Sequence, residues 1–105
     1  MAILFDDANF EQKVLKADRP VLVDFFTPTC GPCRKMAPTI DWLGEELKDV
    51  AVIGKADVSE NTELAVTYKI SAVPTMILFK GGKQVHRSMG VMSEADIKKL
   101  IEDHK

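Results

Sequence analysis

Short apolar runs alternate along the chain with segments whose apolar residues recur at helical spacing. The runs predict five β-strands, over residues 2–5, 21–26, 50–56, 75–79 and, with more polar side chains, 84–89. Residues 21–26 are apolar at nearly every position, so both faces of this strand would be covered. This pattern is typical of a central strand in a sheet that carries helices on both sides.

Helical spacing predicts the segments between these strands. A first helix is expected to begin after Asp6 and Asp7, which are good N-cap residues, and to reach about Lys16. A short helix is expected over residues 63–68. The last helix is expected to begin after Ser93, which would be its N-cap.

The helix that follows Cys30 contains Pro38, and the pattern allows two arrangements. One helix could run over residues 31–47 with a kink at Pro38. Alternatively, a short turn at Cys33 could precede a new helix that starts at Pro38. Apolar residues continue at helical spacing in both cases, so the pattern alone does not choose.

The predicted order of elements is βαβαβα, followed by a β-hairpin and a closing helix. Gly81-Gly82 is a strong signal for the turn of that hairpin. Strands that alternate with helices predict a mainly parallel sheet with right-handed crossovers, here with the antiparallel hairpin at one edge. We therefore expect an α/β fold with three layers, α/β/α, in a single domain over residues 1–105.

Charge and composition exclude some classes of function. The net charge is −2 and the pI about 5.6, which argues against nucleic acid as the main partner. No apolar run approaches the roughly 20 residues of a membrane span. Residues 1–7 lack the basic and long apolar segments of a signal peptide, and two cysteines are too few for the disulfide framework of a small secreted domain. We expect a cytoplasmic protein without a membrane contact.

The candidate chemistry lies in Cys30-Gly31-Pro32-Cys33, which holds both cysteines of the chain. With two residues between them, the thiols can close a small disulfide ring or reopen it. Cys30 is expected at a helix N-terminus, where unpaired N–H groups and the positive end of the helix dipole favour a thiolate. Pro32 suits a first turn because its missing N–H would have no intrahelical partner. The pattern predicts a reactive dithiol.

Asp24 interrupts the predicted central strand, six residues before Cys30. An ionised carboxylate there would cost several kcal/mol to desolvate, and a raised pKa is the usual consequence. Asp24 could then exchange protons with the more buried thiol, directly or through a water; otherwise it lies on an edge face or is paired with a lysine. Lys55 in the next strand could tune the Asp24 pKa, or bury only its stem and keep its ammonium in solvent.

Several further motifs occur in the same order in a known family. The sequence alone favours a trans Val73–Pro74 bond, since only about 5–6% of X-Pro bonds in folded proteins are cis. The chain nevertheless resembles the thioredoxin family over essentially its full length. The motifs that carry the resemblance are Val23-Asp24-Phe25-Phe26, Cys30-Gly31-Pro32-Cys33, Ala37-Pro38, Val73-Pro74-Thr75, Phe79-Lys80-Gly81-Gly82 and Gly90.

The resemblance implies the thioredoxin fold, with a central mixed sheet of about five strands and four helices. It also implies one helix through Pro38 and a cis Val73–Pro74 bond. In the dithiol, Cys30 would be the exposed nucleophile and Cys33 the buried resolving thiol. Asp24 would be the proton acceptor for Cys33.

The resemblance assigns further residues to supporting roles. Gly31 and Pro32 would set the geometry of the dithiol and tune its redox potential. The rim that receives the target would be formed by Val73, Pro74 and Gly90. Apolar contacts from Met89, Val91 and Met92 would flank this rim.

The activity that the resemblance implies is that of a protein-disulfide reductase. No cofactor or metal would be bound, and His86 and His104 have no ligand spacing to the cysteines. Electrons would come from NADPH through a separate, flavin-dependent thioredoxin reductase. The expected partners are this reductase and disulfide-containing target proteins. The protein itself is expected to be a monomer.

Thr29 departs from the family pattern, because thioredoxins usually have Trp immediately before the first cysteine. Phe26 occupies the position where a second Trp is common, and Trp42 is the only tryptophan of the chain. Loss of the indole leaves open a reductase restricted to a few partners. Further alternatives are a non-catalytic adaptor subunit that uses the same apolar rim, and an oxidase or isomerase.

Overall fold

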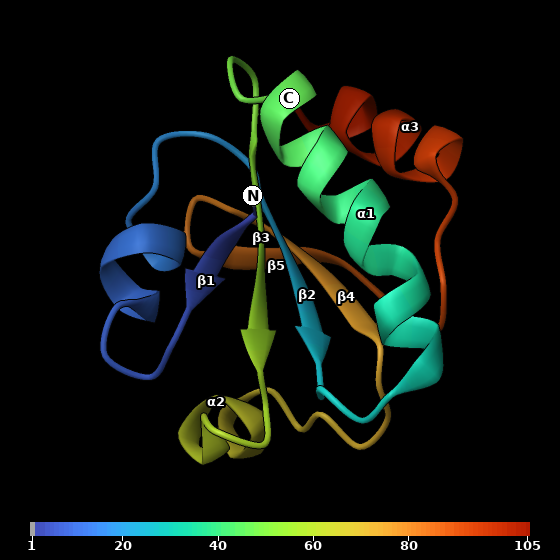
Figure 1. Ribbon diagram of the computed structural model, residues 1–105. Helices are drawn as coiled ribbons and strands as arrows, with labels where there is room; N and C mark the ends of the chain where they lie inside the picture. The colour runs from blue at the N-terminus through green and yellow to red at the C-terminus, as the bar shows by residue number, and fades with distance from the viewer. Residues whose placement is uncertain (1) are drawn as a thin grey trace.

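A five-stranded mixed sheet forms the centre of the computed structural model, which describes residues 2–105 (Figure 1). The strand order is β1-β3-β2-β4-β5. The first three strands in this order are parallel, and β4 and β5 follow as antiparallel neighbours. The strands are β1 (Ile3–Phe5), β2 (Val21–Phe26), β3 (Val52–Asp57), β4 (Thr75–Lys80) and β5 (Lys83–Met89).

Four helices cover the two faces of this sheet. They are η1 (Glu11–Leu15), α1 (Gly31–Glu46), α2 (Thr62–Thr67) and α3 (Glu94–His104). Side chains of α1 and α3 pack on one face, and those of η1 and the α2 region pack on the other (Figure 1). The three-layer α/β/α arrangement and the number of helices are as expected from the sequence, and the mixed sheet is as the resemblance implied. The mainly parallel sheet that the pattern predicted is wrong, because β4 runs antiparallel to β2 as well as to β5. The chain that leaves β3 through α2 enters β4 at the same end of the sheet, which reverses the direction of β4 (Figure 1).

Strand β2 is central and contributes to both halves of the core. Leu22 packs with α1 and α3, whereas Val23 and Phe25 face the opposite layer. That layer contains an aromatic cluster with ring centroids 5.3–6.3 Å apart, formed by Phe5, Phe10, Phe25, Tyr68 and Phe79. Burial of each large apolar side chain contributes about 1.5–3 kcal/mol, so β2 is held firmly where it leads to the dithiol.

The first helix differs from the prediction in its start and its cap. It is a short π-helix, η1, with Phe10 at the N-cap position and no capping side chain. Asp6 Oδ1 accepts a hydrogen bond from the Asn9 N–H (2.7 Å), while Asp7 Oδ1 accepts one from the Leu64 N–H (3.0 Å) in the first turn of α2. Asp6 therefore closes a local turn, and Asp7 caps a helix that is distant in the sequence.

Pro38 lies inside α1, which is one continuous helix. The structure thus decides between the two arrangements that the pattern allowed. Pro38 is exposed, so the carbonyl group that loses its N–H partner can be hydrated. The remaining predictions on turns and caps are confirmed: Gly81 and Gly82 have φ of +60° and +80° in the hairpin turn, and Ser93 Oγ caps α3 by accepting from the Asp96 N–H.

Candidate active site

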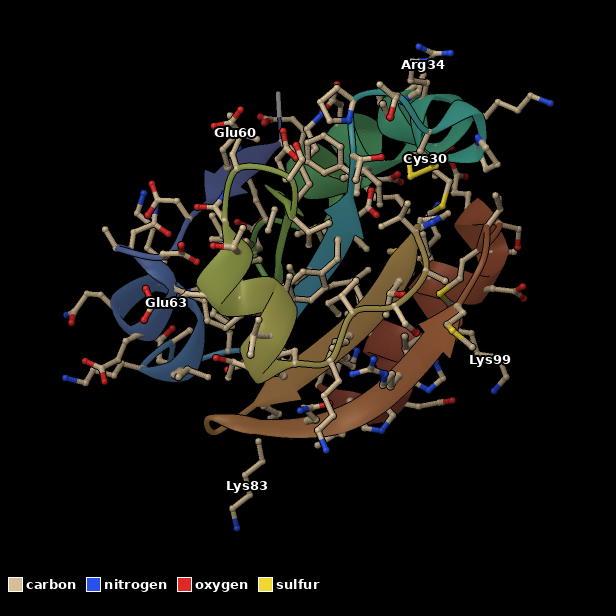
Figure 2. All side chains as sticks on the ribbon, turned by 90° about the horizontal axis from the view of Figure 1, so that it is seen from below. Cys30, Arg34, Glu60, Glu63, Lys83 and Lys99 are labelled. Atoms are coloured by element: carbon tan, nitrogen blue, oxygen red, sulfur yellow. A yellow bond between two sulfur atoms is a disulfide. The ribbon has the colours of Figure 1, made fainter. Side chains whose placement is uncertain are left out.

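The two cysteines lie where β2 leads into α1, and they form a disulfide with their Cα atoms 5.2 Å apart (Figure 2). Cys30 is the N-cap residue of α1, and its Sγ accepts a hydrogen bond from the Cys33 N–H at 3.1 Å. Cys33 is only 3% exposed, whereas Cys30 is partly exposed. An attacking group from another protein can therefore reach Cys30 more readily than Cys33.

The start of α1 favours negative charge on the Cys30 sulfur. The Cys33 N–H points at this sulfur, and the positive end of the helix dipole lies beside it. No acidic residue occupies the first turn of α1 to oppose this effect. Gly31 and Pro32 fill the first two helical positions, where Pro32 leaves no additional N–H without a partner.

Asp24 lies on the face of β2 that α1 covers, and its side chain is 1% exposed. One carboxylate oxygen, Oδ1, is buried without a hydrogen-bond partner among residues 2–105. Burial raises the pKa of Asp24 to about 6, and the positive charge of Lys55 opposes part of this rise. The sequence-based expectation of a buried acid with a raised pKa is therefore confirmed.

A small cavity connects Asp24 with the buried sulfur. Its volume is about 80 Å³, and its lining residues are Asp24, Phe26, Thr27, Pro28, Cys33, Arg34, Ala37 and Lys55. A water molecule needs roughly 10–15 Å³ of such space and several polar partners, and the carboxylate supplies one of them. The cavity thus has room for a water between the acid and the thiol.

Lys55 is the register partner of Asp24 in the neighbouring strand β3, as the sequence suggested. Its Nζ lies 5.3 Å from the centroid of the Phe26 ring, over the ring. Its side chain is half-buried and lines the same cavity. The ammonium group is therefore close enough to lower the Asp24 pKa without a direct ion pair.

The Val73–Pro74 segment lies against the dithiol from the other side. The bond between these residues is cis, as the resemblance implied. The Val73 carbonyl oxygen is 3.8 Å from Cys30 Sγ, so a Cys30 thiol could donate to it. The Gly90 N–H donates to the Pro74 carbonyl at 2.8 Å, and Gly90 has φ +94°, which favours glycine.

Exposed apolar side chains surround this segment. Met89 is 67% exposed and Val91 59% exposed, and Val73 is partly exposed. The structure thus brings the predicted rim residues to one place beside Cys30. Thr29 is exposed immediately before Cys30, so a small polar side chain lies beside the dithiol where the resemblance implied an indole.

Two further residues support this site, and the sequence analysis gave neither of them this role. Thr75 is fully buried, and its Oγ1 donates to the Ala72 carbonyl at 2.6 Å. A threonine at the start of an otherwise apolar strand could have indicated that its hydroxyl binds a nearby backbone carbonyl. Arg87 contacts the backbone between α2 and β4, and nothing in the local sequence pattern of β5 indicates this.

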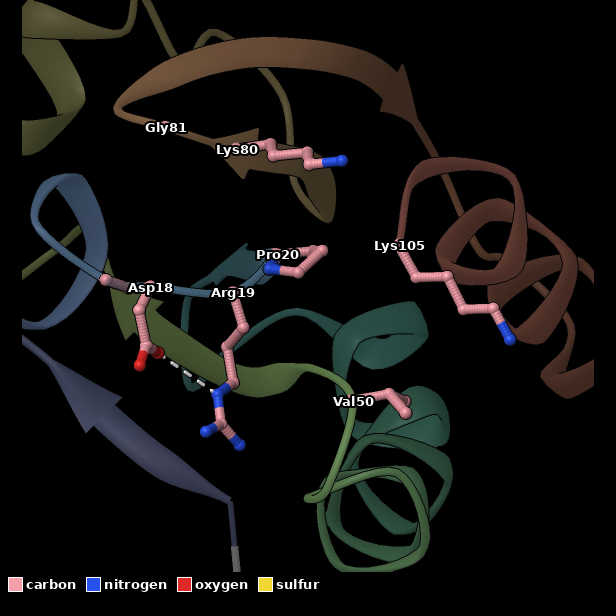
Figure 3. A pocket seen from close by; sticks show the side chains of 8 residues that line it. Asp18, Arg19, Pro20, Val50, Lys80, Gly81 and Lys105 are labelled. Atoms are coloured by element: carbon pink, nitrogen blue, oxygen red, sulfur yellow. Dashed lines mark hydrogen bonds and ion pairs between the residues drawn. The ribbon is translucent and has the colours of Figure 1, made fainter.

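A larger cavity lies elsewhere in the protein (Figure 3). It has a volume of about 560 Å³ and is lined by Ala17, Asp18, Arg19, Pro20, Val50, Lys80, Gly81 and Lys105. Pro20 precedes β2, whereas the dithiol follows the other end of that strand. This cavity is therefore not part of the dithiol site.

Residues 2–105 contain neither a candidate metal site nor a candidate membrane-spanning helix. Among residues 2–105, no group of three or more His, Cys, Asp or Glu side chains could hold a metal ion. None of the helices in this range is both long and apolar enough to cross a membrane.

Comparison with known proteins identifies the family. The family model for thioredoxin matches residues 1–103. Thioredoxin 1 of Nostoc sp. is 38% identical over 98 residues, 93% of this chain and 92% of that protein. The thioredoxin of Chlorobaculum thiosulfatiphilum is 40% identical over 98 residues, 93% of this chain and 91% of that protein. The bifunctional thioredoxin reductase/thioredoxin of Mycobacterium leprae is 38% identical over 97 residues, 92% of this chain and 21% of that protein. The chain, with its Cys30–Cys33 pair, belongs to the thioredoxin family of thiol–disulfide oxidoreductases.

Proposed function

We propose that Cys30 is the attacking thiol of this protein-disulfide reductase, Cys33 the resolving thiol and Asp24 the proton acceptor. The observation that carries this assignment is the unequal exposure of the two sulfurs at the start of α1. Only Cys30 combines access for a protein target with an N–H donor aimed at its sulfur. A target disulfide would therefore meet Cys30 first.

The first step forms a mixed disulfide. The Cys30 thiolate attacks one sulfur of the target disulfide, and the second target sulfur leaves as a thiolate that takes a proton from solvent. The Cys33 N–H stabilises the Cys30 thiolate before attack. One sulfur–sulfur bond replaces another: the target sulfur that left is now a thiol, and the attacked sulfur is still bound to Cys30.

The second step releases the reduced target. Cys33 gives its proton to ionised Asp24 through the cavity between them, and its thiolate attacks Cys30 Sγ. The bond between Cys30 and the target breaks, the target leaves as a thiolate, and the Cys30–Cys33 disulfide forms. Over the two steps together, two electrons pass from the Cys30–Cys33 dithiol to the target. An Asp24 pKa of about 6 keeps the carboxylate mostly ionised near neutral pH, yet basic enough to accept a proton.

The Val73–Pro74 segment would receive the target as an extended chain. The Val73 N–H makes no hydrogen bond to another backbone group among residues 2–105, which leaves it free for a target backbone. Exposed Met89 and Val91 would add apolar contact beside it. Gly90 would permit close approach because no Cβ projects into this rim.

A separate reductase would return the Cys30–Cys33 disulfide to the dithiol. The name of the Mycobacterium leprae relative joins a thioredoxin reductase to a thioredoxin in one protein, which favours such a partner here. We propose that this partner is flavin-dependent and takes its electrons from NADPH, so that the chain itself needs no bound cofactor. We also propose that the chain acts as a cytoplasmic monomer.

A Cys33→Ser variant tests the assignment, because it cannot resolve the mixed disulfide. Incubated with a disulfide-bonded protein such as insulin, it should form a covalent complex through Cys30 that dithiothreitol dissolves. The matched Cys30→Ser variant should form far less complex. Equal capture by both variants would overturn the assignment of the attacking thiol.

Thr29 favours a second candidate, a reductase restricted to a few partners. The exposed threonine removes the large aromatic contact that a tryptophan would offer next to Cys30. Reduction rates measured on several unrelated disulfide proteins decide between the two. Comparable rates on all of them would exclude a restricted range, whereas differences of a hundredfold or more would support it.

A further inference from the structure

Strand β5 contacts the connection between α2 and β4 through an arginine. The guanidinium of Arg87 donates hydrogen bonds to the carbonyl groups of Tyr68 (2.5 Å) and Lys69 (2.9 Å). These carbonyls lie at the C-terminal end of α2, where backbone acceptors lack intrahelical partners and the helix dipole is negative. A planar guanidinium can satisfy two such acceptors at once, which a lysine cannot do in the same geometry.

The connection that follows leads directly to the dithiol. Lys69 has φ +52°, so the chain turns sharply after α2. Figure 1 shows this connection at the same end of the sheet as the loop that begins α1. Four residues later, the Val73 carbonyl lies 3.8 Å from Cys30 Sγ.

Few contacts fix the backbone between these points. Ser71 and Ala72 are exposed, and within the described residues no backbone N–H of residues 71–73 donates to another backbone group. Thr75 Oγ1 holds the Ala72 carbonyl, and the Gly90 N–H holds the Pro74 carbonyl. At the other end, the Ile70 N–H donates to the Ala65 carbonyl of α2, and Arg87 ties this end of α2 to β5.

Helix α2 is too short to act as a rigid anchor by itself. It spans residues Thr62–Thr67, and Leu64 is its one buried residue. Helices of this length are not stable alone, so their ends are fixed by contacts from other elements. Asp7 supplies such a contact at the N-terminal end, and Arg87 supplies it at the C-terminal end.

We propose that Arg87 is a positioning residue for protein substrates, which holds the end of α2 against β5 and thereby fixes the segment that presents Val73 beside Cys30. A protein target that binds along this segment requires the segment to be in the correct position. A small disulfide needs only to reach the Cys30 sulfur, so its reduction does not depend on the segment. This inference rests on the proposed role of Val73 and Pro74 in receiving the target.

Arg87→Ala tests the inference by comparing two substrates. Loss of two hydrogen bonds at a surface site should raise KM for insulin about three- to tenfold with kcat nearly unchanged, as expected when binding alone is weakened. The rate with hydroxyethyl disulfide should stay within twofold of the parent. Arg87→Lys keeps the charge and an N–H donor group but loses the planar fork with its two separate donor nitrogens, so its KM for insulin should lie between those of Arg87→Ala and the parent.

Arg19→Ala is the matched control. Arg19 also donates to a backbone carbonyl, that of Lys48 at 2.9 Å, but it lines the cavity shown in Figure 3. This cavity lies before the start of β2, whereas the dithiol follows the end of that strand. Loss of Arg19 removes the same kind of bond, so KM should match the parent with both substrates. The stability of both variants, measured by urea unfolding, checks that each is folded under the conditions of the assay.

Three outcomes would overturn the positioning role of Arg87. They are an insulin KM within twofold of the parent, equal slowing with insulin and hydroxyethyl disulfide, and an equal effect of Arg19→Ala. Failure of the proposed function is recognised separately. In that case the parent protein itself would not reduce insulin, or the Cys33→Ser variant would not capture it through Cys30.

Discussion

The buried carboxylate of Asp24 makes the stability of the protein depend on pH in an unusual direction. In the folded protein its pKa is raised from 3.8 to about 6, first by burial, with Lys55 opposing the rise. The folded state therefore binds this proton more tightly than the unfolded state. The stability that the protonated group contributes is fully present below about pH 4 and is lost as the pH rises through about 6.

The size of this effect follows from the shift. A change of about two pKa units corresponds to about 3 kcal/mol, which is a large share of the 5–15 kcal/mol that stabilise a typical domain. Asp24→Asn removes the titration and keeps the shape of the side chain. The variant should therefore exceed the parent in stability by up to about 3 kcal/mol at about pH 8, and by much less at about pH 4.

Urea unfolding of the oxidised proteins at these two pH values measures the difference, because the disulfide keeps the thiols from titrating. Asp49→Asn, a change at an exposed carboxylate in the turn after α1, serves as the control and should follow the parent. Two results would show that burial does not destabilise the ionised carboxylate. One is the same gain in free energy of unfolding for Asp24→Asn at both pH values, and the other is a more stable parent at about pH 8.

Three other predictions concern the same region and its support. Asp24→Asn should slow release of the target from the mixed disulfide by about tenfold or more near neutral pH, with the initial attack nearly unchanged; stopped-flow measurement of both steps checks this, and unchanged release would exclude the proton transfer. Lys55→Met should move the Asp24 pKa above its parental value of about 6, since Lys55 lowers it; NMR titration of the carboxyl carbon would show no movement if Lys55 were too far away. Gly54→Ala should destabilise the fold by about 1–3 kcal/mol, because a Cβ there would lie 2.6 Å from both the Ile3 carbonyl oxygen and the Phe5 ring; wild-type stability in urea would contradict this.

Local pattern predicted the strands and the dithiol because both are encoded in neighbouring residues, whereas the antiparallel pairing of β2 with β4 depends on the path of the chain through α2. The apolar run of β2, the break after it and the helix formers after Cys33 place the cysteines at a strand-to-helix junction without further information. The hairpin turn at Gly81-Gly82 depends on two residues that adopt positive φ easily. The burial of Asp24 followed from its place within an apolar strand.

Features that depend on distant partners could not be predicted in this way. The prediction that Asp7 caps the first helix is wrong, because its partner Leu64 lies 57 residues away in the sequence and local pattern cannot reveal it. The residue pattern alone does not predict that α1 continues through Pro38, because the cost of the lost hydrogen bond depends on exposure, which the pattern does not give. The family resemblance implied the continuous helix that the structure has. The cavity between Asp24 and Cys33 exists only because α1 packs over β2.

The unequal reactivity of the two thiols is the feature on which the mechanism depends most. It can be measured by reducing the protein, treating it near neutral pH with less than one equivalent of iodoacetamide, and locating the modified cysteine by peptide mass spectrometry. Because Cys30 is accessible at the start of α1 and Cys33 is 3% exposed, nearly all of the label should be found on Cys30. Equal labelling of the two cysteines, or preferential labelling of Cys33, would contradict the mechanism.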